Sequence, residues 1–234
     1  MPRWDTLTVD GHPMRTYLDL PRGAGTLPAV VVAQHGPGVD EFIQDRVRAL
    51  AARGYLAAAP DLYHRQPREP DMMTRIGRLR DAEIVADVDA TVAHVRALAG
   101  VTVTDVGILG FCMGGRVTYL MAASNPVFRA AAVFYGGNIM KAWGDGPAPF
   151  ALTAKIGCPL IGFFGGEDAN PSPDDVEKIG AELDRLGKPR TFEMYEGAGH
   201  AFLNFMNPKT FREEPARDAW TKCLDFLDAH LGAC

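Results

Sequence analysis

Three residues along the chain have the types and the order that nucleophilic catalysis requires. Cys112 lies between Gly110 and Gly114, directly after an apolar segment. Asp168 follows a second apolar segment, and His200 lies in a glycine-containing loop after a third. A cysteine, a carboxylate and a histidine in this order could form a triad, in which the histidine takes the proton of the thiol and the carboxylate orients the histidine.

The residues around Cys112 have the sequence form of a nucleophile elbow, a sharp turn from a strand into a helix. Small residues are needed two positions before and after the nucleophile, because side chains there would collide with neighbouring backbone. Gly110 and Gly114 meet this need. The motif usually carries serine, but a thiol with a base nearby can react as a thiolate. Taken alone, the motif also fits a buried structural cysteine at the end of a strand.

Asp168 and His200 each have a structural explanation as well. Asp168 could cap the turn before Pro171, and a lone histidine is often a surface residue with ordinary partners. Their order behind the cysteine, each in a loop after a predicted strand, favours the triad over these separate explanations. Glu167 is the neighbouring carboxylate from which Asp168 has to be distinguished.

The elements that must position these residues follow an α/β pattern. Short β-branched runs alternate with segments of helical period, which predicts a mostly parallel sheet flanked by helices in a single domain, 1–234. Two segments rich in proline or glycine, 63–80 and 136–149, interrupt the pattern and could act as a lid. Strands are predicted at 6–9, 14–20, 30–34, 55–59, 106–111, 130–135, 160–164 and 190–195, and helices at 41–53, 82–98, 174–186, 215–230 and directly after Cys112.

Composition excludes several classes of partner. The 234 residues are 47% hydrophobic, enough for one well-packed domain. A net charge of -5 and a pI near 5.7 argue against nucleic acid and anionic membranes as partners. We expect no membrane span and no signal peptide, because no apolar run is long enough. The four cysteines form no CxxC pair, so a cytoplasmic protein is expected.

The chain resembles the dienelactone hydrolase (carboxymethylenebutenolidase-like) family of the α/β-hydrolase fold over nearly its whole length. The resemblance implies that Cys112 is the nucleophile, that His200 is the general base and acid, and that Asp168 orients His200. It also implies an oxyanion hole made by the backbone N–H groups of Gly36 and Met113, donors of the kind that stabilise a tetrahedral oxyanion. The most specific segments are 54–63, 110–115, 165–168 and 196–202.

Two positions depart from the family pattern. Members typically carry a carboxylate where this chain has His35, a residue that could brace the oxyanion loop or stabilise a resting thiolate at Cys112. Members that bind the carboxylate of dienelactone also use an arginine shortly after the catalytic histidine, and here none follows His200 before Arg212. A cation could still come from Arg75, Arg78 or Arg80.

The sequence therefore predicts a hydrolase that cleaves a small ester or lactone, more apolar than dienelactone, by acyl transfer through Cys112, His200 and Asp168. No metal or organic cofactor is required, and the expected partner is a small-molecule ester, lactone or thioester. The sequence leaves the oligomeric state open. Alternatives are a thioesterase or general carboxylesterase, a cysteine peptidase, and a non-catalytic ligand-binding protein of the same fold.

Overall fold

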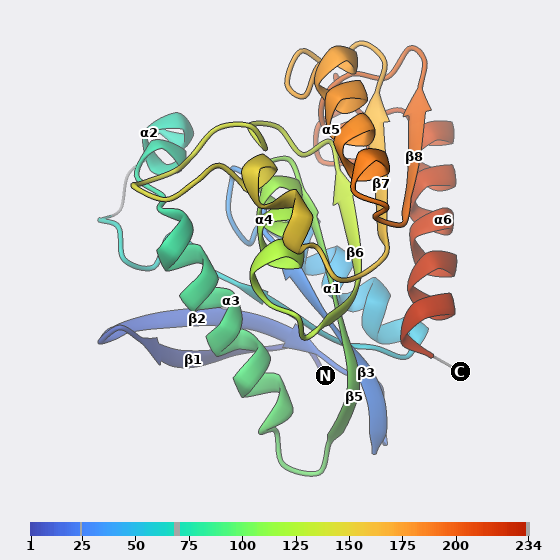
Figure 1. The fold of residues 1–234 in the computed structure, drawn as a ribbon. Helices are drawn as coiled ribbons and strands as arrows, with labels where there is room; N and C mark the ends of the chain where they lie inside the picture. The colour runs from blue at the N-terminus through green and yellow to red at the C-terminus, as the bar shows by residue number, and fades with distance from the viewer. Residues whose placement is uncertain (24, 68–70, 233–234) are drawn as a thin grey trace.

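A strongly twisted sheet runs through the molecule in the computed structural model, which describes residues 1–23, 25–67 and 71–232 (Figure 1). Within these ranges the sheet has eight strands in the order β1-β2-β4-β3-β5-β6-β7-β8. The first two strands and the β2–β4 pair are antiparallel, and the remaining pairs are parallel. The strands are β1 (Arg3–Val9), β2 (His12–Asp19), β3 (Thr26–Ala33), β4 (Leu56–Pro60), β5 (Thr102–Phe111), β6 (Phe128–Phe134), β7 (Leu160–Gly165) and β8 (Arg190–Tyr195).

Helices cover both faces of the sheet. On one face lie α1 (Glu41–Arg53) and α6 (Glu213–Leu231), whose buried side chains share a core with the strands. On the other face lie α3 (Asp81–Arg96), α4 (Met113–Ser124) and α5 (Pro173–Arg185). This arrangement confirms the predicted α/β-hydrolase fold class. Among the helices of the described residues, none has both the length and the apolar character needed to cross a membrane.

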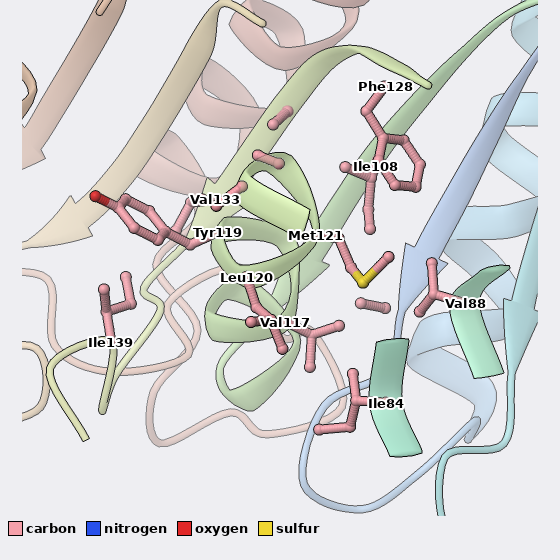
Figure 2. Close-up of a cluster of buried hydrophobic side chains, with 14 of the residues drawn as sticks. Ile84, Val88, Ile108, Val117, Tyr119, Leu120, Met121, Phe128, Val133 and Ile139 are labelled. Atoms are coloured by element: carbon pink, nitrogen blue, oxygen red, sulfur yellow. The ribbon is translucent and has the colours of Figure 1, made fainter. Parts of the chain in front are cut away.

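The helix that follows Cys112 is the most deeply buried of the set. Every residue of α4 from Met113 to Ala123 is buried. Figure 2 shows Val117, Leu120 and Met121 packed among apolar side chains from β5, β6 and α3. Because protein interiors are packed as densely as organic crystals, a helix held on all sides keeps its first turn fixed. The start of α4 is therefore a rigid support for the residue before it.

The hairpin prediction and most element boundaries are confirmed to within a few residues. Asp10 and Gly11 turn the first hairpin with φ of 50° and 79°, as Asp-Gly does in a two-residue turn whose central residues both have positive φ. Two short elements were not predicted, namely α2 (Met72–Gly77) and a 3₁₀ helix at Pro149–Lys155. Both are too short for a hydrophobic period to show in the sequence.

Candidate active site

Cys112 occupies the sharp turn between β5 and α4. Its φ of 58° and ψ of -120° are uncommon for a residue with a side chain. A Cβ on Gly110 would lie 2.2 Å from the carbonyl oxygen of Gly114, and a Cβ on Gly114 would lie 2.2 Å from that of Ala33. The chain can make this turn only because both positions are glycine.

His200 and Asp168 lie in the loops that follow β8 and β7, at the same edge of the sheet as Cys112. The Nδ1 atom of His200 is 2.8 Å from Oδ2 of Asp168. The other carboxylate oxygen accepts a hydrogen bond of 2.9 Å from the backbone N–H of Asn170. The side chain of Asp168 is 2% exposed and that of His200 is 36% exposed, so the carboxylate is shielded while the imidazole faces the cavity.

Hydrogen bonding and charge at the Cys112–His200 pair favour a thiolate facing an imidazolium. Burial by itself raises the pKa of Cys112, but the hydrogen bond and charge of His200 outweigh it and hold the pKa below its ordinary value. Burial likewise lowers the pKa of His200, but contacts with Asp168 and Cys112 raise the pKa to about 10. A thiolate is the reactive form of cysteine, so this arrangement suits nucleophilic attack.

Two backbone N–H groups also act on the sulfur of Cys112. Those of Met113 and Gly36 both hydrogen-bond to it and help to lower its pKa. Met113 is the first residue of α4, and Gly36 lies in the loop after β3. Two donors from different elements thus converge beside the sulfur of Cys112, which is the arrangement that an oxyanion hole needs.

His35 is buried, at 4% exposure, and lies away from the lining of the cavity. Its Nε2 atom is 2.8 Å from Oδ1 of Asp40, the residue that caps the start of α1. The His35 ring also packs against Phe42, with the ring centroids 5.3 Å apart. These contacts tie the loop of Gly36 to α1, which fits the loop-bracing interpretation of His35. The charged partner that lowers the pKa of Cys112 is His200.

A second contact to the oxyanion loop comes from the loop after β4, and sequence reasoning missed it. The hydroxyl of Tyr63 donates a hydrogen bond of 2.8 Å to the carbonyl oxygen of Gly36 and lies 3.3 Å from Sδ of Met113. One residue earlier, the N–H of Leu62 donates to Oε1 of Gln34 at 3.2 Å. Tyr63 therefore contacts both residues that supply the N–H donors. The segment 54–63, one of those that carry the family resemblance, contained Tyr63 without indicating this contact.

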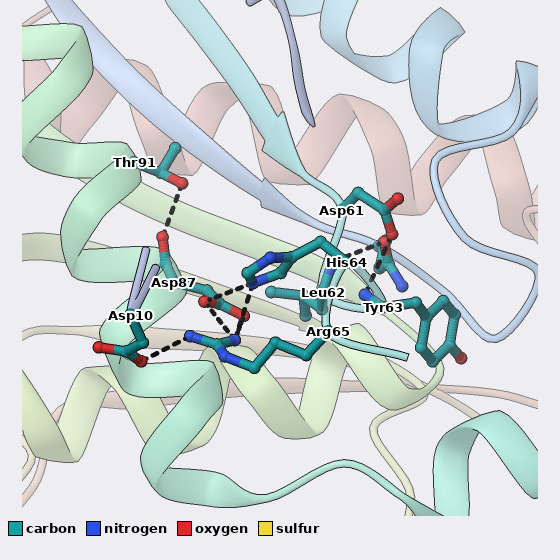
Figure 3. Close-up of polar contacts among 9 residues, drawn as sticks. Asp10, Asp61, Leu62, Tyr63, His64, Arg65, Asp87 and Thr91 are labelled. Atoms are coloured by element: carbon teal, nitrogen blue, oxygen red, sulfur yellow. Dashed lines mark hydrogen bonds and ion pairs between the residues drawn. The ribbon is translucent and has the colours of Figure 1, made fainter. Parts of the chain in front are cut away.

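A buried polar cluster anchors the loop of Tyr63 to α3 (Figure 3). Nε2 of His64 lies 3.0 Å from Oδ1 of Asp87, and Arg65 contacts both oxygens of the same carboxylate at 2.7 and 2.8 Å. Arg65 also reaches Asp10 in the first hairpin, at 2.8 Å. The side chain of Asp87 is 1% exposed. Buried charges that are paired in this way hold their segments in one position.

A cavity of about 510 Å³ opens over the sulfur of Cys112. One wall is α2, which contributes Met72, Met73 and Ile76. Further walls come from the loop after β6 and the loop after β7. Most of the lining surface is apolar, and the polar side chains come mainly from these two loops. Besides the three residues of α2, the cavity is lined by Cys112, Met113, Gly137, Asn138, Trp143, Glu167, Asp168, Ala169, Asn170 and His200.

Comparison with known proteins identifies the family. The model of the dienelactone hydrolase family matches residues 14–231. The chain belongs to this family. A protein of Synechocystis sp. named "Putative carboxymethylenebutenolidase" is 36% identical over 227 residues, which are 92% of this chain and 91% of that protein. A "Putative Dienelactone Hydrolase" from Klebsiella pneumoniae has a solved structure with a TM-score of 0.89, 33% identity and coverage of 97% of each chain.

This member of the dienelactone hydrolase family has no arginine among the described residues that line the reaction cavity. Of the arginines considered from the sequence, Arg75 places its guanidinium 3.8 Å from the ring centre of Tyr63. Arg80 donates to the carbonyl oxygens of Gly77 and Leu79, and it lines a neighbouring cavity. The large side chains of Met72, Met73 and Trp143, which lie in the two interrupting segments 63–80 and 136–149, line the cavity, whereas Phe150 does not.

Proposed function

We propose that this protein hydrolyses a small ester or lactone by acyl transfer through Cys112, His200 and Asp168. The observation that carries the proposal is the continuous set of contacts from Asp168 through His200 to Cys112, at the floor of an apolar cavity. Family membership supports the same class of reaction. The contacts match the geometry expected of a nucleophile whose base is oriented by a third group.

In the first half of the reaction the Cys112 thiolate attacks the carbonyl carbon. The electron pair of the carbonyl moves to its oxygen, which then receives hydrogen bonds from the N–H groups of Gly36 and Met113. When the tetrahedral intermediate collapses, the bond to the leaving oxygen breaks and the His200 imidazolium protonates that oxygen. The product of this half is a thioester on Cys112, with the alcohol released or, for a lactone, still joined to the acyl group.

In the second half a water molecule cleaves the thioester. Neutral His200 takes a proton from the water, which attacks the acyl carbon, and the same two N–H groups stabilise the second oxyanion. Collapse then expels the Cys112 thiolate and leaves the carboxylic acid. Asp168 keeps Nδ1 of His200 protonated throughout, so that Nε2 is the atom that exchanges protons with the reactants.

We also propose that the substrate is neutral around the scissile bond. The cavity presents methionine, isoleucine and tryptophan side chains, and no arginine of the described residues lines it. A screen should compare p-nitrophenyl esters of graded chain length, lactones including dienelactone, and acyl thioesters. Selective turnover of dienelactone over neutral esters would contradict the neutral-substrate proposal. Faster cleavage of thioesters would favour the alternative activity, a thioesterase.

The reactivity of the thiols separates a catalytic protein from a non-catalytic one. Near neutral pH, iodoacetamide should modify Cys112 first, because burial raises the pKa of Cys158 to about 11 and raises that of Cys223 as well. Mass spectrometry of digests over time would measure the order. The remaining cysteine, Cys234, lies outside the described residues. Equal labelling of Cys112 and Cys158 would contradict the proposal.

The pH dependence of the same alkylation reports the pKa of Cys112. Since His200 lowers this pKa, the rate should reach half its maximum below about 8.5, the value of a free thiol. Ester hydrolysis should rise as Cys112 ionises and fall near pH 10, where His200 loses the proton that the leaving group needs. An alkylation midpoint at or above about 8.5 would contradict a resting thiolate.

Tyr63→Phe tests the support of the oxyanion loop. The change removes one hydroxyl, and with it the hydrogen bond to the carbonyl of Gly36, but keeps the ring. Removing an oxyanion donor lowers kcat by about 10²–10³-fold. In Tyr63→Phe the N–H of Gly36 remains but is held less firmly, so kcat should fall on the order of 10-fold with little change in KM. Tyr55→Phe is the matched control, because it also removes a hydroxyl contact, to Asp228, far from the cavity. Equal kcat losses in both variants would contradict a positioning role.

A cytoplasmic location is the remaining part of the proposal. A reducing compartment protects a thiolate nucleophile from disulfide formation. Cys112, Cys158 and Cys223 are free thiols in the structure. Fractionation of cells that express the protein would test the location.

A further inference from the structure

We propose that Trp143 sets the length of the substrate group that the reaction cavity accepts, and that the buried Arg116–Asp81 ion pair positions Trp143 for this purpose. The inference rests on the proposed ester hydrolysis, and it names the substrate class of the same site. It assigns a specificity-determining role to Trp143 and a positioning role to two residues that do not touch the substrate.

Trp143 stands between two cavities of similar size. The reaction cavity above Cys112 and a second cavity beside it each measure about 510 Å³. Four residues line both of them, namely Met73, Ile76, Asn138 and Trp143. Trp143 is the largest of these side chains and is 8% exposed. It therefore forms a large part of the wall, or partition, that the two cavities share.

Trp143 is held at its backbone and at its ring. Its N–H donates to Oδ2 of Asp81 at 3.0 Å, and its carbonyl accepts from the N–H of Asp81 at 2.7 Å. The guanidinium of Arg116 stacks over the indole, 3.9 Å from the ring centre. An arginine on the face of a tryptophan is a favourable contact, and more so where water is excluded. These contacts fix the side chain in one orientation.

One guanidinium fixes the whole segment that carries Trp143. Arg116 is fully buried and contacts both carboxylate oxygens of Asp81, at 2.5 and 2.9 Å. It also donates to the carbonyl oxygens of Asn138, at 3.1 Å, and Lys141, at 2.6 Å. Arg116 lies in the first turn of α4, so the partition and the nucleophile are supported by the same rigid helix.

The partition has a direct chemical consequence. A short acyl group fits within the reaction cavity, whereas a long unbranched chain would have to pass Trp143. The second cavity lies on the other side of this shared wall, and removal or displacement of the indole would open its space to such a chain. The natural substrate class is therefore an ester or lactone with a short or compact acyl group.

Activity on p-nitrophenyl esters from acetate to laurate tests the inference. Trp143→Ala should raise the ratio of kcat/KM for laurate to that for acetate by about 10-fold or more, since several methylenes of the long chain gain contacts with Met73, Ile76 and Leu79. Trp143→Phe should give a smaller shift in the same direction. Asp81→Asn, which weakens the contacts that hold the indole, should also shift the ratio toward long chains.

Asp87→Asn is the matched control for Asp81→Asn. It makes the same substitution further along α3, in a buried ion pair with Arg65 that lines neither cavity. It should lower the melting temperature without changing the chain-length ratio. If Asp81→Asn and Asp87→Asn move the ratio equally, Asp81 has no positioning role.

A second measurement does not depend on turnover. Alkylation of Cys112 by iodoacetamide and by N-dodecyl iodoacetamide compares access to the sulfur directly. The ratio of the alkylation rate with the long reagent to that with the short one should rise in Trp143→Ala, even if the protein hydrolyses no ester. An unchanged selectivity between the two reagents in a folded Trp143→Ala variant would overturn the inference. If no ester is hydrolysed but the ratio of alkylation rates changes as expected, the result would contradict the proposed hydrolysis and leave the role of Trp143 standing.

Discussion

Cys112→Ala is expected to abolish ester hydrolysis, with a loss of about 10⁴-fold or more in kcat, because the covalent intermediate cannot form without the sulfur. The fold should persist. Alanine keeps the Cβ that this backbone conformation already accommodates, and α4 is held by its own buried side chains. Initial rates with a p-nitrophenyl ester, together with a circular dichroism melting curve, would measure both parts of the prediction.

Cys158→Ala provides the control for this experiment. Cys158 is also a buried free thiol, but it packs in the core on the α4 side of the sheet and does not line the cavity. Its loss should leave kcat nearly unchanged. Cys112→Ser should retain some activity with a sizeable loss, since His200 is placed to serve a thiolate. Undiminished hydrolysis by Cys112→Ala would show that Cys112 is not the nucleophile.

His200→Ala should lower kcat by about 10²–10⁴-fold, because the variant lacks the group that protonates the leaving oxygen and activates water. It should also slow the alkylation of Cys112 near neutral pH, since His200 is the charged group that lowers the pKa of the thiol. Measuring both rates distinguishes a catalytic histidine from a structural one. Slow hydrolysis with unchanged alkylation would mean that His200 does not contact the sulfur in solution.

Asp168→Asn should lower kcat less than His200→Ala does. The amide keeps the shape of the carboxylate but no longer favours the tautomer with a proton on Nδ1 of His200. Glu167→Gln is the matched control, because Glu167 lines the same cavity while Asp168 makes the contact to His200. It should remain close to normal activity. A severe loss of kcat in Glu167→Gln together with a mild loss in Asp168→Asn would mean that Glu167, rather than Asp168, is the acid of the triad.

The local signals in the sequence were sufficient for the fold class, and they singled out three residues that the structure places in contact. Gly110 and Gly114 predicted the turn at Cys112 because their requirement is steric and local, and the structure shows the collisions that side chains would cause there. The order of strands predicted that Asp168 and His200 would meet at one edge of the sheet, because parallel strands end on the same side. Those predictions depend on neighbours along the chain.

The walls and supports of the site come from segments that are distant in sequence. His35 lies against Asp40, and a single chain position could not indicate which side of the loop its ring would take. Tyr63 contacts Gly36 from the loop after β4, and its hydroxyl could equally have faced solvent. α2 is too short to produce a recognisable period, although Met72 and Ile76 form a cavity wall.

By itself, the sequence determined what is local in this protein: the alternation of strands and helices, the glycine-flanked turn at Cys112, and the order of Cys112, Asp168 and His200 along the chain. Only the tertiary structure decided which side chains surround that chemistry. Arg116 and Asp81 are 35 residues apart, and their contact with Trp143 arises because α3, α4 and the loop after β6 pack together on one face of the sheet. Such contacts depend on how buried surfaces fit across elements, and no spacing along the chain encodes that fit.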